Sequence, residues 1–334
     1  MIDLPTIWFG ILCLQIALYI LLDGADLGLG LLSLLPKKES EESLMMQTVG
    51  PIWDANETWL VIAAGTLFGA FPLAYSIILN ALYIPVMLLL FGLILRAASF
   101  EFHTLAHNKK IWSLMFGVGS LMAIVGQGTA LGGLLGGITI VDGQFAGGAF
   151  DWVTPLTLFI TVGVAFSYAV VGYAYLIKKT SHEMAGNSFA HVLVAAGVTF
   201  VAFLTATLML PQMQYVFLSR WSTAPANYLL FAIAGAIGLV SLLLCYDLLR
   251  KRHREHLHTL CMIIFVLAMA GMLVGVYPYL IPPMLTIQAA AASEKTLQFM
   301  LYGIAPLLPI VLAYNFYLYR VFRRHMGPSE REGY

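Results

Sequence analysis

The stretch IWFGILCLQIALYILLDGADLGLGLL, residues 7–32, decides the fold class, because it is long and apolar enough to cross a bilayer. A transmembrane helix needs roughly 20 apolar residues, and this run is longer. It nevertheless carries two carboxylates, Asp23 and Asp26, three residues apart near its end. The stretch predicts a membrane-spanning helix and raises the question of what two acids do inside it.

The composition of the whole chain also indicates a membrane protein. The 334 residues are 60% hydrophobic and 10% charged, with a mean hydropathy of +0.87, whereas a soluble domain carries about 25% charged residues. The formal net charge of zero argues against nucleic acid as a partner. The three cysteines, Cys13, Cys245 and Cys261, have no metal-binding spacing and are interpreted as small apolar fillers.

Long apolar runs recur along the chain and predict an all-α, polytopic membrane protein with about nine transmembrane helices arranged in helical bundles. We expect a single integral-membrane subunit with two four-helix bundles, about 6–138 and 154–280, and a last helix at about 297–322. The nine predicted spans cover residues 6–35, 50–70, 74–98, 112–138, 154–178, 189–211, 227–250, 257–280 and 297–322.

The basic residues indicate the orientation of these spans. If the spans alternate in direction, 15 of the 17 Lys and Arg residues fall on one side of the membrane, and only Arg220 and Lys295 fall on the other. The positive-inside rule makes the basic side cytoplasmic. We therefore expect the C-terminus on the cytoplasmic side and the N-terminus on the opposite side of the membrane. The 15 residues are Lys37, Lys38, Arg96, Lys109, Lys110, Lys178, Lys179, Arg250, Lys251, Arg252, Arg254, Arg320, Arg323, Arg324 and Arg331.

Acids from three predicted helices reach the same cytoplasmic level. Asp26 lies about 30 Å along the first span, Asp54 lies one turn into the second, and Glu101 follows the third. Burying a charge there costs several kcal/mol unless it is paired, solvated or neutralised, and proton relay is a common use of such acids. We expect these three acids to form a protonatable chain, with Arg96 setting their charge state. Glu57 lies one turn beyond Asp54 on a similar face.

A structural interpretation of the same residues stays open. Asp23 and Asp26 could cap unwound backbone around Gly24 and Gly28, or could pair with Arg96. Under this interpretation the acids stabilise the fold and carry no proton.

The basic and aromatic neighbours of these acids also allow more than one role. Arg96 could be the counter-ion of Glu101 or Asp54, or could extend to the membrane interface. Trp53 and Trp59 are interpreted as interface anchors or core residues.

The histidines provide no convincing haem site. Seven of the eight lie in or beside predicted cytoplasmic loops, and His191, which begins a span, has no obvious partner. His103 and His107, four residues apart, could ligate a metal, but we expect them on a solvated face. Two function classes remain: a stand-alone proton-coupled membrane transporter, or a subunit that feeds protons to redox chemistry in another chain. The lack of an evident inverted repeat argues against the transporter.

Several motifs resemble those of a known family. DGADLGLG (23–30) and GPIWDANETWL (50–60) resemble the signatures DGfDlGvG and GPvWDgNevWL of subunit II of cytochrome bd-type quinol oxidases, and LRAASFEFH (95–103) is similar to that family's LRgvaFEfR. Further matches follow in family order: GQGTALGGLLGGI (126–138), FAGGAFDWVTP (145–155), YAYLIKKT (173–180), YPYLIPP (277–283) and SEKTLQFMLYGIAPLLPIVLAY (293–314).

The resemblance implies the non-haem subunit of a ubiquinol oxidase, paired with a haem-bearing subunit I as a heterodimer. It places two b-type haems, one d-type haem and the quinol-oxidising loop in subunit I, and no cofactor or metal in this chain. The complex oxidises quinol, reduces oxygen to water and builds proton-motive force electrogenically. The implied partners also include membrane lipid and a small single-helix third subunit, and a structural quinone occurs in some relatives. The resemblance also implies a location in the bacterial inner membrane, with a periplasmic N-terminus and a cytoplasmic C-terminus.

The resemblance also implies roles for individual residues. Carried over by motif, Asp26, Asp54 and Glu101 line a cytoplasmic proton entry. The predicted proton pathway comprises Asp26, Asp54, Glu101, Arg96, Asp23 and Glu57, and the predicted structural positions are Gly24, Gly28, Trp53, Asn56 and Trp59.

The chain departs from the family pattern at a few positions. Ala290 and Ala291 stand where many members carry Asp, so a role for that acid is in doubt here. Ala55 replaces the usual Gly after Asp54, which a helix should tolerate, and His103 replaces a common Arg.

Overall fold

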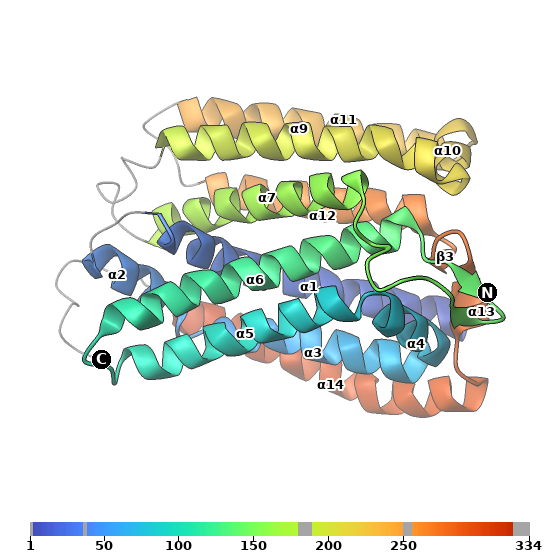
Figure 1. Cartoon of the computed structure of the whole chain (residues 1–334), viewed down its shortest axis with the longest axis horizontal. Helices are drawn as coiled ribbons and strands as arrows, with labels where there is room; N and C mark the ends of the chain where they lie inside the picture. Colours follow the sequence, from blue (N-terminus) through green and yellow to red (C-terminus); the bar gives the residue numbers. More distant parts are fainter. Residues whose placement is uncertain (1–2, 36–38, 180–188, 250–255, 323–334) are drawn as a thin grey trace.

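The computed structural model describes residues 3–35, 39–179, 189–249 and 256–322. Its long helices lie side by side and run between two ends of the molecule (Figure 1). The elements are α1 (Leu4–Ser33), α2 (Glu39–Val49), α3 (Trp53–Ala70), α4 (Pro72–Ala81), α5 (Tyr83–His103), α6 (Lys109–Gly136), β1 (Ile140–Val141), β2 (Gln144–Phe145), α7 (Pro155–Lys179), α9 (Phe189–Met213), α10 (Tyr215–Ser222), α11 (Ala226–Leu249), α12 (Leu257–Val276), β3 (Tyr279–Ile281), β4 (Leu285–Thr286), α13 (Ile287–Ala290) and α14 (Glu294–Val321).

The helices confirm the predicted class, an all-α polytopic membrane protein. Among the residues described, eight helices are long and apolar enough to span a membrane, namely α1, α5, α6, α7, α9, α11, α12 and α14. The bent pair α3 and α4 passes the same test when the two are taken together, which makes up to nine spans.

The third predicted span, residues 74–98, is wrong in its first third. α3 ends at Ala70, and α4 continues at an angle of 118° to it. Pro72 opens α4 and has no amide hydrogen to extend the hydrogen bonding of α3, so the helix breaks there. A second break at Leu82 precedes α5, which carries Pro85 in its first turn, where a proline is tolerated.

Short strands form in two segments, one after α6 and one after α12. The glycine-rich segment after α6 forms an antiparallel hairpin, β1–β2, in which Ile140 pairs with Phe145. Asp142 and Gly143 form its turn with φ values of 50° and 75°, a backbone that Asp and Gly adopt readily. α12 ends at Val276, and the following Tyr-Pro-Tyr-Leu-Ile-Pro-Pro segment enters the hairpin of β3 and β4.

The start of α1 is fixed by a capping residue. The Asp3 carboxylate accepts the Thr6 backbone N–H at 3.1 Å, which satisfies one of the free amides of the first turn. The side-chain hydrogen bond with Thr6 lowers the pKa of the exposed Asp3 carboxyl below its usual value.

α1 lies in the middle of the molecule and packs on α3, α6 and α7. The contact with α7 is close because both helices present glycine: a Cβ on Gly28 would lie 1.9 Å from the Tyr168 carbonyl oxygen, and one on Gly172 would lie 2.5 Å from the Gly28 carbonyl carbon. Small residues let membrane helices approach in this way. The glycine at position 28 therefore permits the short distance between α1 and α7.

The division into two bundles stays a prediction. α1 and α6, from the first predicted bundle, pack extensively on α7 of the second, and α14 packs on α3.

The predicted membrane orientation is likewise a prediction that the structure does not test, although the described basic residues fit it. Lys109 begins α6, Lys178 and Lys179 end α7, and Arg320 lies in the last turn of α14, all toward one end of the bundle, whereas Lys295 begins α14 at the other (Figure 1). Outside the described residues lie Lys37, Lys38, His182, Arg250, Lys251, Arg252, His253, Arg254, Arg323, Arg324, His325 and Arg331.

Candidate functional site

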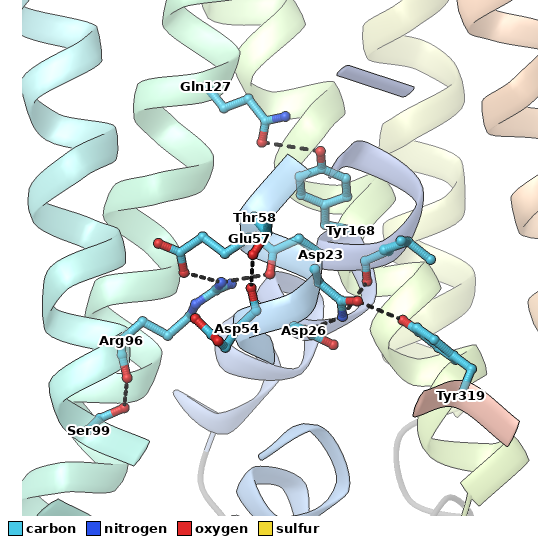
Figure 2. Close-up of polar contacts among 12 residues, drawn as sticks. Asp23, Asp26, Asp54, Glu57, Thr58, Arg96, Ser99, Gln127, Tyr168 and Tyr319 are labelled. Atoms are coloured by element: carbon cyan, nitrogen blue, oxygen red, sulfur yellow. Dashed lines mark hydrogen bonds and ion pairs between the residues drawn. The ribbon is translucent and has the colours of Figure 1, made fainter. Parts of the chain in front are cut away.

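An ionic cluster joins three helices in the interior. Nη2 of Arg96, on α5, lies 2.6 Å from Oδ1 of Asp23 on α1 and 3.1 Å from Oε2 of Glu57 on α3 (Figure 2). The Arg96 and Asp23 side chains have no exposed surface, and the Glu57 side chain keeps 20% of its surface exposed. Ser99, three residues beyond Arg96, donates its hydroxyl to the Arg96 carbonyl at 2.6 Å. Arg96 and Asp23 are thus held away from water.

The pairing of Arg96 decides between the alternatives left open by the sequence. Its two ion pairs among the described residues are with Asp23 and Glu57, so the expectation that its counter-ion is Glu101 or Asp54 is wrong. The expectation that it extends to the interface is also wrong, because Arg96 is 0% exposed.

A second polar group lies beside the ionic cluster. Asn56, on α3, donates Nδ2–H to Oδ2 of Asp26 at 2.8 Å and to the Leu22 carbonyl at 3.4 Å. Its Oδ1 accepts the hydroxyl of Tyr319, on α14, at 3.1 Å (Figure 2). Asn56 is 0% and Asp26 1% exposed. Asp26 therefore has a neutral amide as its hydrogen-bond partner, whereas Asp23 has a cation.

Further polar side chains border Asp23. Tyr168, on α7, packs against Gly24 and donates its hydroxyl to Oε1 of Gln127, on α6, at 3.1 Å. Tyr19 lies one helical turn before Asp23 on α1 and interacts electrostatically with it. The polar interior of the molecule is thus built from six helices: α1, α3, α5, α6, α7 and α14.

The other two acids of the predicted chain lie outside this cluster. Asp54 is exposed in the first turn of α3, where its carboxylate faces the favourable end of the helix dipole. Glu101 is exposed near the end of α5. Both occupy the end of the bundle at which α1 and α5 finish (Figure 1). The structure thus places Asp26 inside, and Asp54 and Glu101 at the surface.

The remaining predicted positions lie in different environments. Trp59 is fully buried, and Trp53 stacks on Phe100 with ring centroids 5.2 Å apart. Ala55 is buried within α3, as expected of a residue that a helix tolerates.

His103 is 6% exposed, so its predicted place on a solvated face is wrong: it ends α5 facing the interior. His107 is exposed. Within the described ranges, no group of three or more His, Cys, Asp or Glu side chains could hold a metal ion.

Sequence reasoning missed Tyr319, Tyr168, Gln127 and Tyr19. Tyrosine is frequent in membrane helices as an interface anchor, so its type alone gives no sign of a buried contact. Asn56 stood in a quoted motif, but nothing in the sequence placed its amide between Asp26 and a helix more than 200 residues away.

The charges of the site do not balance. Asp23, Asp26 and Glu57 supply three carboxyls within reach of one guanidinium, that of Arg96. An uncompensated charge at this depth costs several kcal/mol. The site thus holds more carboxyls than cations, and the partner of each carboxyl decides how its charge is compensated.

These features define the chain as a multi-pass helical membrane protein with ionisable groups buried between its spans. It belongs to the cytochrome bd terminal oxidase subunit II family, whose profile matches residues 4–322.

Two known proteins and one solved structure are similar to this chain. The chain is 26% identical to cytochrome bd ubiquinol oxidase subunit 2 of Bacillus subtilis (strain 168), over 99% of both chains. It is 29% identical to cytochrome bd-I ubiquinol oxidase subunit 2 of Escherichia coli (strain K12), where the match spans 61% of this chain and 56% of that protein. A chain in the structure of bd oxidase from Geobacillus thermodenitrificans has the same fold, with a TM-score of 0.76 at 17% identity, and the match covers 96% of this chain and 98% of that one.

Proposed function

We propose that this chain is the haem-free subunit of a membrane quinol oxidase and that its buried acids take up protons from the cytoplasm for oxygen reduction in the partner subunit. Family membership supports the oxidase subunit over the stand-alone transporter that the sequence left open. In this proposal the two b-type haems, the d-type haem and the quinol site belong to subunit I. Water formation consumes protons from one side of the membrane, which makes turnover electrogenic.

The observation that carries the proposal is the contrast between Asp23 and Asp26. Asp23 pairs with Arg96 and thereby neutralises it, and Glu57, which is partly exposed, shares the same guanidinium. Asp26, at 1% exposure, is hydrogen-bonded to the neutral Asn56 amide. The hydrogen-bond partner of Asp26 therefore brings no positive charge, and a bound proton can supply the charge compensation that this buried carboxyl needs.

The exposed acids complete the route. Asp54 and Glu101 lie at the surface of the same end of the bundle and can exchange protons with water directly. Glu57 lies one turn from Asp54 on α3 and contacts Arg96, so it lies between the surface and the buried pair. Protons enter at Asp54 and Glu101, pass the Glu57–Arg96–Asp23 cluster and load Asp26.

The test is Asp26→Asn in the assembled complex, which keeps the size of the side chain and removes the titratable proton. Quinol-driven oxygen consumption and proton uptake by oriented vesicles should both fall about tenfold or more. Asp142→Asn is the matched control, because Asp142 is exposed in the turn of β1–β2, whose backbone suits Asn. Unchanged turnover and uptake in Asp26→Asn would contradict the relay.

The haem assignment has its own test. The complex should purify with a partner whose reduced spectrum shows b- and d-type haems, and this chain purified alone should show none. A haem spectrum from the isolated chain would refute the assignment.

A further inference from the structure

We infer that the last helix, α14, positions the Asp26 carboxyl for proton uptake through a two-step hydrogen-bond chain from Tyr319 to Asn56 to Asp26. This inference rests on the proposed function, because it concerns the group that is proposed to carry the proton. Tyr319 lies in none of the motifs that identified the family in the sequence, and it belongs to a helix remote from the acids in the chain.

The chemistry of the Asn56 amide makes its orientation matter. A carboxamide presents an acceptor oxygen on one side and two N–H donors on the other. The Tyr319 hydroxyl donates to Oδ1 at 3.1 Å, and this leaves Nδ2 to donate to Asp26 at 2.8 Å and to the Leu22 carbonyl at 3.4 Å. If the amide were rotated by half a turn, its oxygen would face the Asp26 carboxyl oxygen instead. The phenol thus selects the orientation in which the amide donates to Asp26.

Burial makes this selection effective. Asn56 is 0% exposed and Asp26 1% exposed, so bulk water does not reach the amide to replace a lost partner. A buried acceptor left without a donor loses about 1–3 kcal/mol, which is enough to favour another orientation of the amide. The hydrogen bonds join α14, α3 and α1, so a shift of α14 is transmitted to the proton-carrying group (Figure 2).

The end of α14 is itself held in place. Lys179, the last residue of α7, donates Nζ–H to the carbonyl of Phe322, three residues after Tyr319. The same ammonium lies 5.8 Å from the centre of the Tyr175 ring, a distance typical of a cation–π contact. Asn315, one turn before the half-buried Tyr319, is buried, although most of α14 is exposed. The two inward-facing residues thus mark the part of α14 that meets the interior.

Tyr319 acts through Asn56 and is therefore a positioning residue. Its loss should alter the environment of the Asp26 proton and slow turnover, but should not abolish turnover. One neutral hydrogen bond contributes about 0.5–1.5 kcal/mol, so we expect turnover to fall about two- to tenfold.

The decisive measurement is infrared difference spectroscopy of the assembled complex during a pH titration. The carbonyl-stretch band of the Asp26 carboxylic acid is the band lost in Asp26→Asn. In Tyr319→Phe, which removes only the hydroxyl, this band should shift. Tyr317→Phe is the matched control, because Tyr317 lies on the same helix but is 62% exposed, and it should leave the band unchanged.

A further variant tests whether Tyr319 acts through Asn56. Asn56→Ala should shift the same band, and adding Tyr319→Phe to Asn56→Ala should produce no additional shift. Additive shifts would overturn the two-step chain.

The outcomes separate this inference from the proposed function. An Asp26 band that does not change in Tyr319→Phe would overturn the inference and leave the relay standing. If Asp26→Asn removed no band at any pH, the proton-carrying role itself would fail, and the inference with it. A shifted band with unchanged proton uptake in Asp26→Asn would uphold the positioning by Tyr319 and reject the relay.

Discussion

Arg96 uses a single nitrogen, Nη2, to contact two carboxylates from different helices: Asp23 on α1 at 2.6 Å and Glu57 on α3 at 3.1 Å. Three helices that are far apart in the sequence are thereby joined at one atom. Because the Arg96 and Asp23 side chains are fully buried, this pairing depends on all three helices being in place. It compensates the charge of the buried Asp23 carboxylate.

Replacing Arg96 with Gln should destabilise the assembled complex. Breaking a buried pair leaves an uncompensated charge, which costs about 3–5 kcal/mol. A lower melting temperature or a lower yield of complex would show this loss. Lys295→Gln, which removes an exposed cation at the start of α14, serves as the control. Adding Asp23→Asn to Arg96→Gln should restore part of the stability, and a further loss in the double variant would contradict the pairing.

Gly28→Ala should weaken the packing of α1 on α7. The added Cβ would lie 1.9 Å from the Tyr168 carbonyl oxygen, so the helices must move apart. Overpacking of this kind costs about 1–3 kcal/mol, measurable as a lower melting temperature of the complex. Gly10→Ala is the matched control on the same helix, since a Cβ there meets nothing within 4 Å. Equal melting temperatures for both variants would argue against a close contact.

Neutralising the surface acids should affect turnover less than neutralising Asp26. Asp54 and Glu101 are exposed, so water can deliver protons past either of them. We expect Asp54→Asn and Glu101→Gln each to lower proton uptake by less than about threefold, against about tenfold or more for Asp26→Asn. A larger effect of Asp54→Asn than of Asp26→Asn would reverse the proposed order of the groups.

The orientation of the chain can be tested by thiol labelling. Lys109 and Lys295 are both exposed, at opposite ends of the bundle. In a background with Cys13, Cys245 and Cys261 replaced by Ala, a membrane-impermeant maleimide should label Lys295→Cys from the periplasmic side. It should label Lys109→Cys only after the membrane is opened. The reverse pattern would invert the orientation predicted by the positive-inside rule.

The long apolar runs were sufficient to predict the fold class and, among the residues described, seven of the eight candidate membrane spans closely. Backbone groups in a bilayer must bond within their own helix, so length and hydropathy determine a membrane helix locally. The prediction separated two spans between residues 70 and 74, but it missed the angle of 118° between α3 and α4 and the break at Leu82, because hydropathy stays high through both helices. Hydropathy reports whether a segment is in the membrane, whereas the direction of its axis depends on the hydrogen bond that the proline removes.

The functional residues show the same difference between what the local sequence predicts and what the packed structure decides. The sequence by itself predicted that Asp23 and Asp26 lie at membrane depth, because both stand within an apolar run and a charge there needs a partner or a function. It left Arg96 either as a counter-ion or as a residue that extends to the interface. Only the tertiary structure decided which partners they have: Arg96 bonds Asp23 and Glu57, and Asp26 bonds Asn56, which bonds Tyr319. A hydrogen bond requires atoms about 3 Å apart, and residues separated by up to 263 positions reach that distance only when α1, α3, α5 and α14 are packed together.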